Sequence, residues 1–195
     1  MSAEIRAPER DLRLDFFRGL AMLIILLAHI PFNGWALWIP ARFGFSDATE
    51  MFVFCSGMAS AIAFGASFTK RGWWLGTARI LFRVWQVYWA QIGMVLATIA
   101  VLYLIDRNDW GLEGKEYLKN VPVLPLFNRT GEALLGLFTL NWVPNYFDIL
   151  PMYLVILAMI PAMMALHRFA GREAVFGAVI AIWIAAQFGL LDLPS

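Results

Sequence analysis

Charged residues are scarce in this 195-residue sequence, and cysteine is almost absent. Only 15% of the residues are charged, whereas 61% are hydrophobic. A soluble globular domain has about 25% charged and about 45–50% apolar residues. Both percentages of this chain differ from these values in the direction expected of a membrane protein. Cys55 is the only cysteine, which excludes an intramolecular disulfide and a thiolate-rich metal site. The formal net charge of +1 provides no basic field for nucleic acid.

Three short catalytic and binding motifs are also lacking. The chain has no phosphate loop, no zinc-binding spacing and no Gly-x-Ser-x-Gly nucleophile turn. We therefore expect no metal site, and any chemistry must come from ionisable side chains within or beside the apolar segments.

Five apolar segments each approach the roughly 20 residues that a helix needs to cross a hydrocarbon core of about 30 Å. They cover residues 15–31, 47–68, 80–105, 147–166 and 174–191. We therefore predict an all-α fold: a polytopic transmembrane helix bundle of about five helices, forming one integral membrane domain over residues 1–195. The first helix either continues through the GWALWIP segment or stops near the outer interface. The odd number of helices, and a chain that stops directly after the fifth, indicate a partial chain of a larger bundle.

Basic residues are concentrated in the segments that face the cytoplasm if the N-terminus is cytoplasmic. That orientation places ten of the fifteen basic residues inside: Arg6, Arg10, Arg13, Arg18, Lys70, Arg71, Arg79, Arg83, Arg168 and Arg172. Since cytoplasmic segments of membrane proteins carry an excess of Lys and Arg, we predict a cytoplasmic N-terminus. His167 then lies in an inner loop, with lipid headgroups as its expected partners. The connection from residue 106 to residue 146 lies outside, and its apolar patch EALLGLFTL is a candidate interfacial helix.

In the first apolar segment, Arg18 and His29 are separated by ten residues that are neither charged nor polar. Eleven positions in an α-helix amount to about 20° beyond three full turns. Both side chains therefore share one face, about 16 Å apart along the axis. Asp15 joins this face, and ionisable residues within a membrane helix mark functional sites. Two interpretations stay open: a snorkelling Arg18 with a carbonyl-bonded His29, or a polar site between helices.

Carboxylates lie at the outer ends of two later helices. Asp47 and Glu50 have the spacing of a capping box, with Asp47 as the N-cap. Glu50 also lies at about the depth of His29, so it is equally a candidate to orient the imidazole. Asp148 either benefits from the dipole of the fourth predicted helix, where Asn145 is an equal candidate for the cap, or faces the bundle near Glu50 and His29. We name His29, Glu50 and Asp148 as candidate catalytic residues.

Arg79 and Arg83 project from one face of the third predicted helix because they are four residues apart. Anchoring at the cytoplasmic interface explains Arg79 well and the deeper Arg83 less well. The other interpretation is anion binding, for which planar, permanently charged guanidinium groups are suited. Arg18, with Asp15 beside it, belongs to the same group of candidates.

Four segments resemble the OpgC proteins of bacteria: RLDFFRGLAMLIILLAHIP, FGFSDATEMFVFCSGMASAIAFG, RVWQVYWAQ and NYFDILPMYLVIL. OpgC proteins are inner-membrane enzymes that succinylate osmoregulated periplasmic glucans, and they resemble the wider acyltransferase-3 superfamily. That superfamily has an Arg or Lys, ten residues and then a His on its first helix, as Arg18 and His29 have here. It also has two Arg separated by two residues in a later helix, whereas Arg79 and Arg83 are separated by three. The family fold is a larger helix bundle, of which the chain resembles the N-terminal half.

The resemblance implies O-acyl transfer at the bacterial inner membrane. Cytoplasmic acyl-CoA, with succinyl-CoA as the expected co-substrate, would supply the acyl group, and a periplasmic glucan hydroxyl would accept it. Arg18, Arg79 and Arg83 would then bind the acyl donor. His29 would act as general base, and Glu50 or Asp148 would hold its imidazole. No permanently bound cofactor is implied, and the expected partners are membrane lipid, glucan and acyl-CoA.

Two other functions stay open. A transporter or flippase for an anionic or acylated sugar would line its pathway with the same charged stripe. A non-catalytic membrane scaffold would need none of these residues for chemistry.

Overall fold

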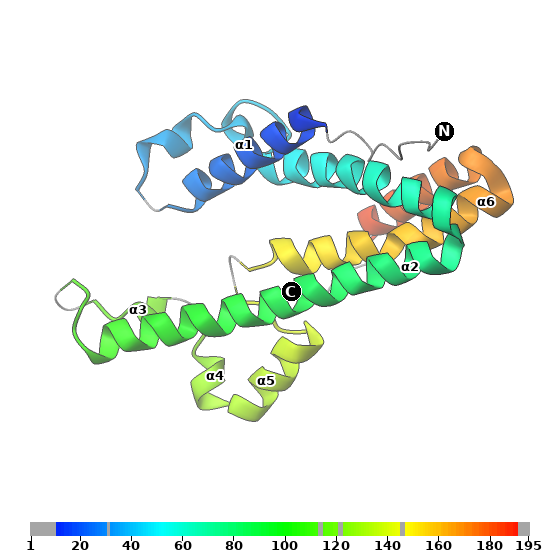
Figure 1. The fold of residues 1–195 in the computed structure, drawn as a ribbon. Helices are drawn as coiled ribbons and strands as arrows, with labels where there is room; N and C mark the ends of the chain where they lie inside the picture. Colours follow the sequence, from blue (N-terminus) through cyan, green and yellow to red (C-terminus); the bar gives the residue numbers. More distant parts are fainter. Residues whose placement is uncertain (1–10, 31, 113–114, 121–122, 145–146, 191–195) are drawn as a thin grey trace, which may run out of the picture. The chain divides into compact units, whose positions relative to one another are not determined.

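The computed structural model describes residues 11–30, 32–112, 115–120, 123–144 and 147–190. Throughout these ranges every regular element is a helix, which confirms the all-α prediction (Figure 1). The chain divides into two compact units, residues 1–81 and 82–195, and the division falls inside the helix α2 (Ala48–Arg107).

In the first unit, α1 (Leu12–His29) starts three residues before the predicted segment. It does so because the Asp11 carboxylate accepts a hydrogen bond from the Arg13 amide at 3.0 Å and caps the helix. The helix stops at His29 and does not continue through GWALWIP. Two short 3₁₀ helices follow instead, η1 (Gly34–Leu37) and η2 (Pro40–Arg42).

The helix α2 contains the second and third predicted spans, joined by a sharp bend at Gly72 (Figure 1). The segment between the spans was expected to be a loop, but it is helical except at Gly72, with φ 80° and ψ 171°. This backbone conformation is essentially restricted to glycine. Gly76 also serves the bend, since a Cβ there would lie 2.7 Å from the ring of Phe68.

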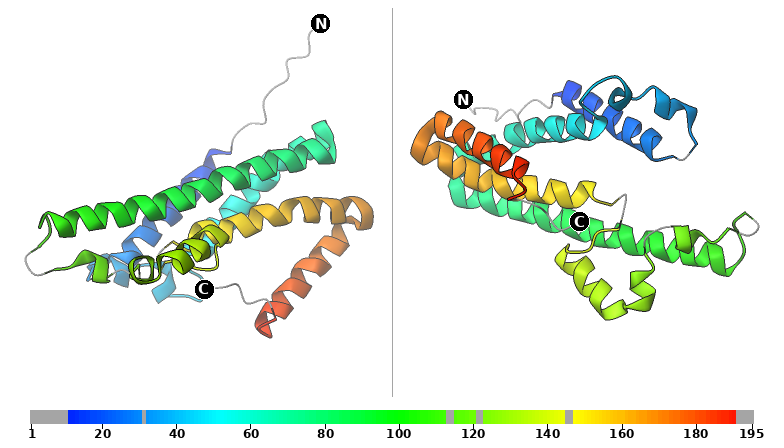
Figure 2. Two further views of the ribbon diagram at one scale, coloured as in Figure 1. Left: turned by 90° about the horizontal axis from the view of Figure 1, so that it is seen from below. Right: turned by 180° about the vertical axis from the view of Figure 1, so that it is seen from behind.

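The second unit holds the rest of α2, three short helices and the long helix α6 (Ile149–Gln187). The short helices are α3 (Tyr117–Asn120), α4 (Pro125–Asn128) and α5 (Thr130–Thr139). The helix α5 confirms a helix in the EALLGLFTL patch. The helix α6 joins the last two predicted spans through a bend at Gly171, with φ 82° and ψ −177° (Figure 2). His167 therefore lies in a helix, and its expected loop position is wrong.

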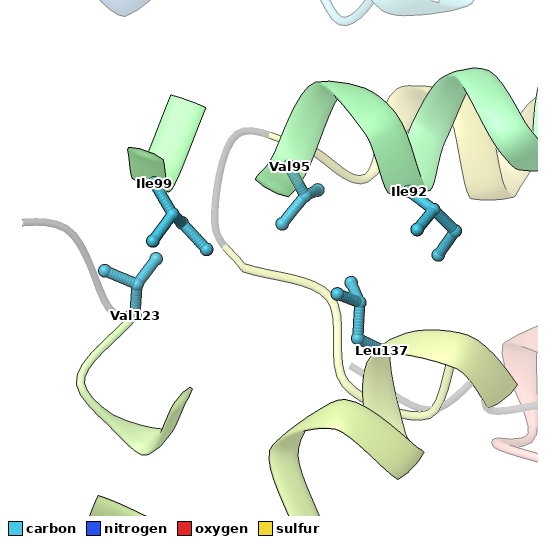
Figure 3. Packing of buried hydrophobic residues seen from close by; sticks show 5 residues of the cluster. All are labelled: Ile92, Val95, Ile99, Val123 and Leu137. Carbon is cyan, nitrogen blue, oxygen red and sulfur yellow. The ribbon is translucent and has the colours of Figure 1, made fainter. Parts of the chain in front are cut away.

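The core of the second unit forms where α5 and the segment before α4 pack on the second arm of α2, the part of the helix that follows Gly72. Five buried residues form it: Ile92, Val95, Ile99, Val123 and Leu137 (Figure 3). On α2 the spacing of three and four residues places its three members on one helix face. Leu137 comes from α5 and is fully buried. Apolar packing thus fixes the segment after α2 onto that helix.

Within the described chain, α2 and α6 are the two helices long and apolar enough to cross a membrane. Only 22% and 11% of the residues in their most apolar windows are buried, whereas the core helix of a soluble protein is mostly buried. These exposed apolar surfaces, together with the composition, indicate a membrane protein. The α1 helix has only 18 residues and includes three charged ones, so the count of five crossing helices stays a prediction.

Candidate active site

Asp15 and Arg18 form an ion pair one turn apart on α1. Arg18 Nη2 donates to Asp15 Oδ1 at 2.6 Å, and both side chains are largely covered, with 34% and 23% of their surface exposed. The guanidinium charge therefore has a partner on its own helix, and the snorkelling interpretation stays open. This bond uses one of five N–H donors, so Arg18 keeps donors with which to bind an anion.

His29 is the last residue of α1, and its Nδ1 lies 2.7 Å from the carbonyl oxygen of Ile25. A carbonyl oxygen only accepts hydrogen bonds, so the neutral imidazole carries its proton on Nδ1 and has the lone pair on Nε2. The expected carbonyl bond is confirmed, and it selects the tautomer that a base acting through Nε2 requires. A carboxylate that orients the ring at Nδ1 would have to displace Ile25.

The connection after His29 is fastened to the end of α1 by Asn33. Its Nδ2 donates to the Leu27 carbonyl at 3.0 Å, and its Oδ1 accepts from the Trp35 amide at 3.0 Å. The first bond satisfies a carbonyl that the end of the helix leaves without a partner, and the second caps η1. Asn33 therefore fixes the backbone on both sides of the candidate base.

Asp47 and Glu50 form the predicted capping box at the start of α2. Asp47 Oδ1 accepts from the amides of Thr49 and Glu50 at 2.8 Å and 3.1 Å, and Glu50 Oε2 accepts from the Asp47 amide at 3.3 Å. The cap role of both residues is thus confirmed. The second role of Glu50, as partner of the His29 imidazole, stays a prediction.

The two arginines of α2 make different contacts. Arg79 Nη1 donates to Ser67 Oγ at 2.8 Å across the Gly72 bend, and its guanidinium lies 6.0 Å from the ring centre of Phe64. Arg79 thereby joins the two arms of the bend. Arg83 is exposed and donates to Gln86 Oε1 at 3.4 Å on its own helix. Both arginines are exposed, and Arg79 also has a structural role because it joins the two sides of the bend.

Asp148 occupies the N-cap position of α6, and its carbonyl accepts from the Met152 amide at 3.1 Å. Its side chain makes no capping hydrogen bond to the helix and is exposed. The predicted position at the start of the helix is confirmed, and the carboxylate is available for another role. Asn145, the alternative cap, lies outside the described residues.

Gln91 was not singled out from the sequence, although it contacts the residue before Asp148. It is fully buried, and its Nε2 donates to the carbonyl oxygen of Phe147 at 2.9 Å. Its Oε1 is buried without a hydrogen-bond partner in the described part of the chain. The available signal was an amide in the middle of an apolar helix, which is costly unless it is bonded. Gln91 thus holds the residue next to Asp148.

Residues 10–195 match the family model described as OpgC protein. The chain belongs to the OpgC protein family. The four segments on which the resemblance rested lie within this range, so the expected family is confirmed. No curated protein and no solved structure matches this OpgC-family chain. Membership suggests a role of the glucan succinyltransferase type.

The candidate site of this OpgC-family chain thus falls into local groups. The pairs Asp15–Arg18 and Asp47–Glu50 are each brought together by a hydrogen bond. His29 lies on the same helix as Arg18, as predicted. The described residues contain no group of three or more His, Cys, Asp and Glu side chains that could hold a metal ion. The catalytic roles of His29, Glu50 and Asp148 stay predictions.

Proposed function

We propose that this chain carries out O-acyl transfer, moving a succinyl group from cytoplasmic succinyl-CoA to hydroxyl groups of a periplasmic glucan. The observation that carries the proposal is the family match over residues 10–195. The arrangement on α1 supports it, because one uninterrupted helix bears a paired guanidinium and an imidazole with a defined tautomer.

In the proposed reaction, His29 Nε2 takes the proton of a glucan hydroxyl while the hydroxyl oxygen attacks the thioester carbonyl. The tetrahedral intermediate then collapses: the carbon–sulfur bond breaks, the new ester forms and the CoA sulfur leaves. The proton passes from the imidazolium to this thiolate, so the products are the glucan ester and CoA–SH. General-base assistance of this kind contributes about 10²–10⁴-fold to the rate.

The basic side chains would hold the anionic donor. Arg18 suits the succinyl carboxylate or a CoA phosphate, because Asp15 orients its guanidinium and leaves other N–H donors for the ligand. Arg83, which is exposed, is a second candidate. The carboxylate of Glu50 or that of Asp148 would stabilise the imidazolium that forms when His29 takes the proton.

The experiment uses the purified protein in proteoliposomes with succinyl-CoA and glucan, and mass spectrometry measures glucan succinylation. We expect His29→Gln to lower kcat by about 10²–10⁴-fold, since the amide cannot act as a base. His167→Gln is the matched control, because His167 is the other histidine and is exposed on α6. Wild-type turnover by His29→Gln would remove the catalytic assignment, and absence of turnover in the wild-type protein would remove the proposed reaction.

A transporter or flippase is the second candidate function. It rests on the charged residues of α1, which could line a pathway, because the glycine bends of α2 and α6 lie between predicted spans and interrupt none of them. Movement of an anionic glucan across a liposome membrane without acyl-CoA would support this function over acyl transfer.

A further inference from the structure

A pocket of about 410 Å³ opens between α4 and α5 in the second unit. Its volume lies in the range of about 300–1,000 Å³ that is usual for small-molecule sites. The lining combines Trp142 with three polar residues, Asn128, Arg129 and Glu132. None of these residues belongs to the candidate active site.

The polar side chains offer both donors and acceptors without a net charge. Arg129 donates, Glu132 accepts and Asn128 does both. Arg129 Nη1 lies 3.7 Å from Glu132 Oε2, and the two side chains are 76% and 79% exposed. Such a long, exposed ion pair is weak, so a ligand bearing hydroxyl groups can replace it at little cost. An anion would meet Glu132, and an acyl chain would form hydrogen bonds with none of the three polar groups.

Trp142 is held in place by packing and by a backbone hydrogen bond. It packs against the buried cluster that includes Leu137, and its amide donates to the Gly136 carbonyl at 3.1 Å. Leu140, in the left-handed conformation with φ 58°, ends α5 and turns the chain back toward Gly136. A side chain at Gly136 would lie 2.8 Å from the Trp142 Cβ, so the glycine permits this close approach. A ring fixed in this way loses little entropy on binding a ligand.

We propose that this pocket binds one sugar ring of the glucan acceptor. The apolar face of a sugar ring packs on an aromatic ring, and its hydroxyl groups both donate and accept hydrogen bonds, as the three polar side chains require. The assignment rests on the proposed function, which makes a glucan the acceptor. It adds a binding subsite and names the residues that select a neutral saccharide.

Two hydrogen bonds from neighbouring residues of α2 hold α5, which lines the pocket, and the backbone next to Asp148. Tyr88 donates to the Phe138 carbonyl in α5 at 2.7 Å, and Gln91 donates to the Phe147 carbonyl at 2.9 Å. Three residues correspond to a rise of about 4.5 Å, so both bonds come from adjacent turns of one helix. A glucan chain bound in the pocket is thereby placed relative to Asp148 by a single rigid element.

The test measures binding of a neutral, unsubstituted glucose oligosaccharide to the protein in lipid nanodiscs by calorimetry, together with the KM for glucan in the succinylation assay. We expect Trp142→Leu to raise the Kd and the KM about tenfold, in line with the loss of one contact to an aromatic ring. The kcat and the KM for succinyl-CoA should stay unchanged. Trp110→Leu is the matched control, since Trp110 is 73% exposed and lies outside the pocket.

A second variant avoids disturbing the packing under Trp142. The double substitution Arg129→Ala/Glu132→Ala removes only exposed groups, so the fold should be retained. We expect it to raise the Kd for the oligosaccharide several-fold. Wild-type Kd and KM in both variants, or no oligosaccharide binding to the wild-type protein, would overturn the subsite. Trp142-dependent binding without any succinylation would instead uphold the subsite and remove the proposed reaction.

Discussion

The imidazole of His29 and the guanidinium of Arg18 owe their state to near neighbours on one helix. The Ile25 carbonyl selects the His29 tautomer, and the Asp15 carboxylate pairs with Arg18. Both partners lie three or four residues away, a spacing at which helical residues are neighbours. These features could therefore be anticipated from the sequence, which already placed Asp15, Arg18 and His29 on one face.

Gln91 is the residue whose role could not be anticipated in this way. Its partner, Phe147, is 56 residues distant in sequence, and no local spacing predicts the bond. The same is true of Tyr88 and Phe138, which are 50 residues apart. Residues that bind a loop to a helix can be identified only from the folded structure, because tertiary packing decides which donor meets which carbonyl.

We predict that Gln91→Leu lowers the free energy of unfolding by about 1–3 kcal/mol, because the Phe147 carbonyl loses the donor that Gln91 supplies. Denaturant titration of the protein in detergent measures this change. Gln86→Leu is the control, since Gln86 is exposed on the same helix and its amide oxygen only accepts a long bond from Arg83. Equal stability of the two variants would mean that the Gln91 bond contributes nothing.

At the scale of elements, the start of α2 was predictable and the bends were not. The capping box of Asp47 and Glu50 is encoded within three residues, and the start of α2 agrees with the prediction within one residue. The segment around Lys70 and Arg71 has the composition of a loop, but helical hydrogen bonding continues up to and beyond Gly72. A single glycine at positive φ is sufficient to reorient the helix, and composition does not distinguish this from a longer loop.

Gly72→Ala should destabilise the protein by about 1–3 kcal/mol, because a Cβ disfavours the observed backbone conformation. Gly65→Ala provides the contrast. Gly65 lies within the first arm of α2, and a Cβ added there would have no neighbouring atom within 4 Å, so alanine should be neutral or slightly stabilising. Chemical unfolding in detergent compares the two variants, and a neutral Gly72→Ala would contradict the need for glycine at the bend.

At the scale of the whole molecule, the composition identified a membrane protein, whereas the arrangement of its spans needs an experiment. Basic residues flank both glycine bends, Lys70 and Arg71 before Gly72 and Arg172 after Gly171. The excess of Lys and Arg on cytoplasmic segments therefore predicts that both bends face the cytoplasm and that α5 faces the periplasm.

This orientation can be tested by cysteine labelling, because the chain has only one cysteine and it is buried. In a Cys55→Ala background, we expect Thr130→Cys to react with a membrane-impermeant maleimide in spheroplasts. Ala170→Cys should react only after the membrane is permeabilised. Both positions are exposed, so access from one side decides the result. The opposite labelling pattern would reverse the predicted orientation.

The bonds from Tyr88 and Gln91 to the distant carbonyls also set an order of events during biosynthesis. At a synthesis rate of about 5–20 residues per second, Phe147 follows Gln91 by about 3–11 seconds. During this interval the newly made α2 arm carries an amide whose final acceptor does not yet exist, and an unsatisfied polar group in lipid costs several kcal/mol. The half-made chain therefore carries an unpaired donor at Gln91 until the ribosome has passed Phe147.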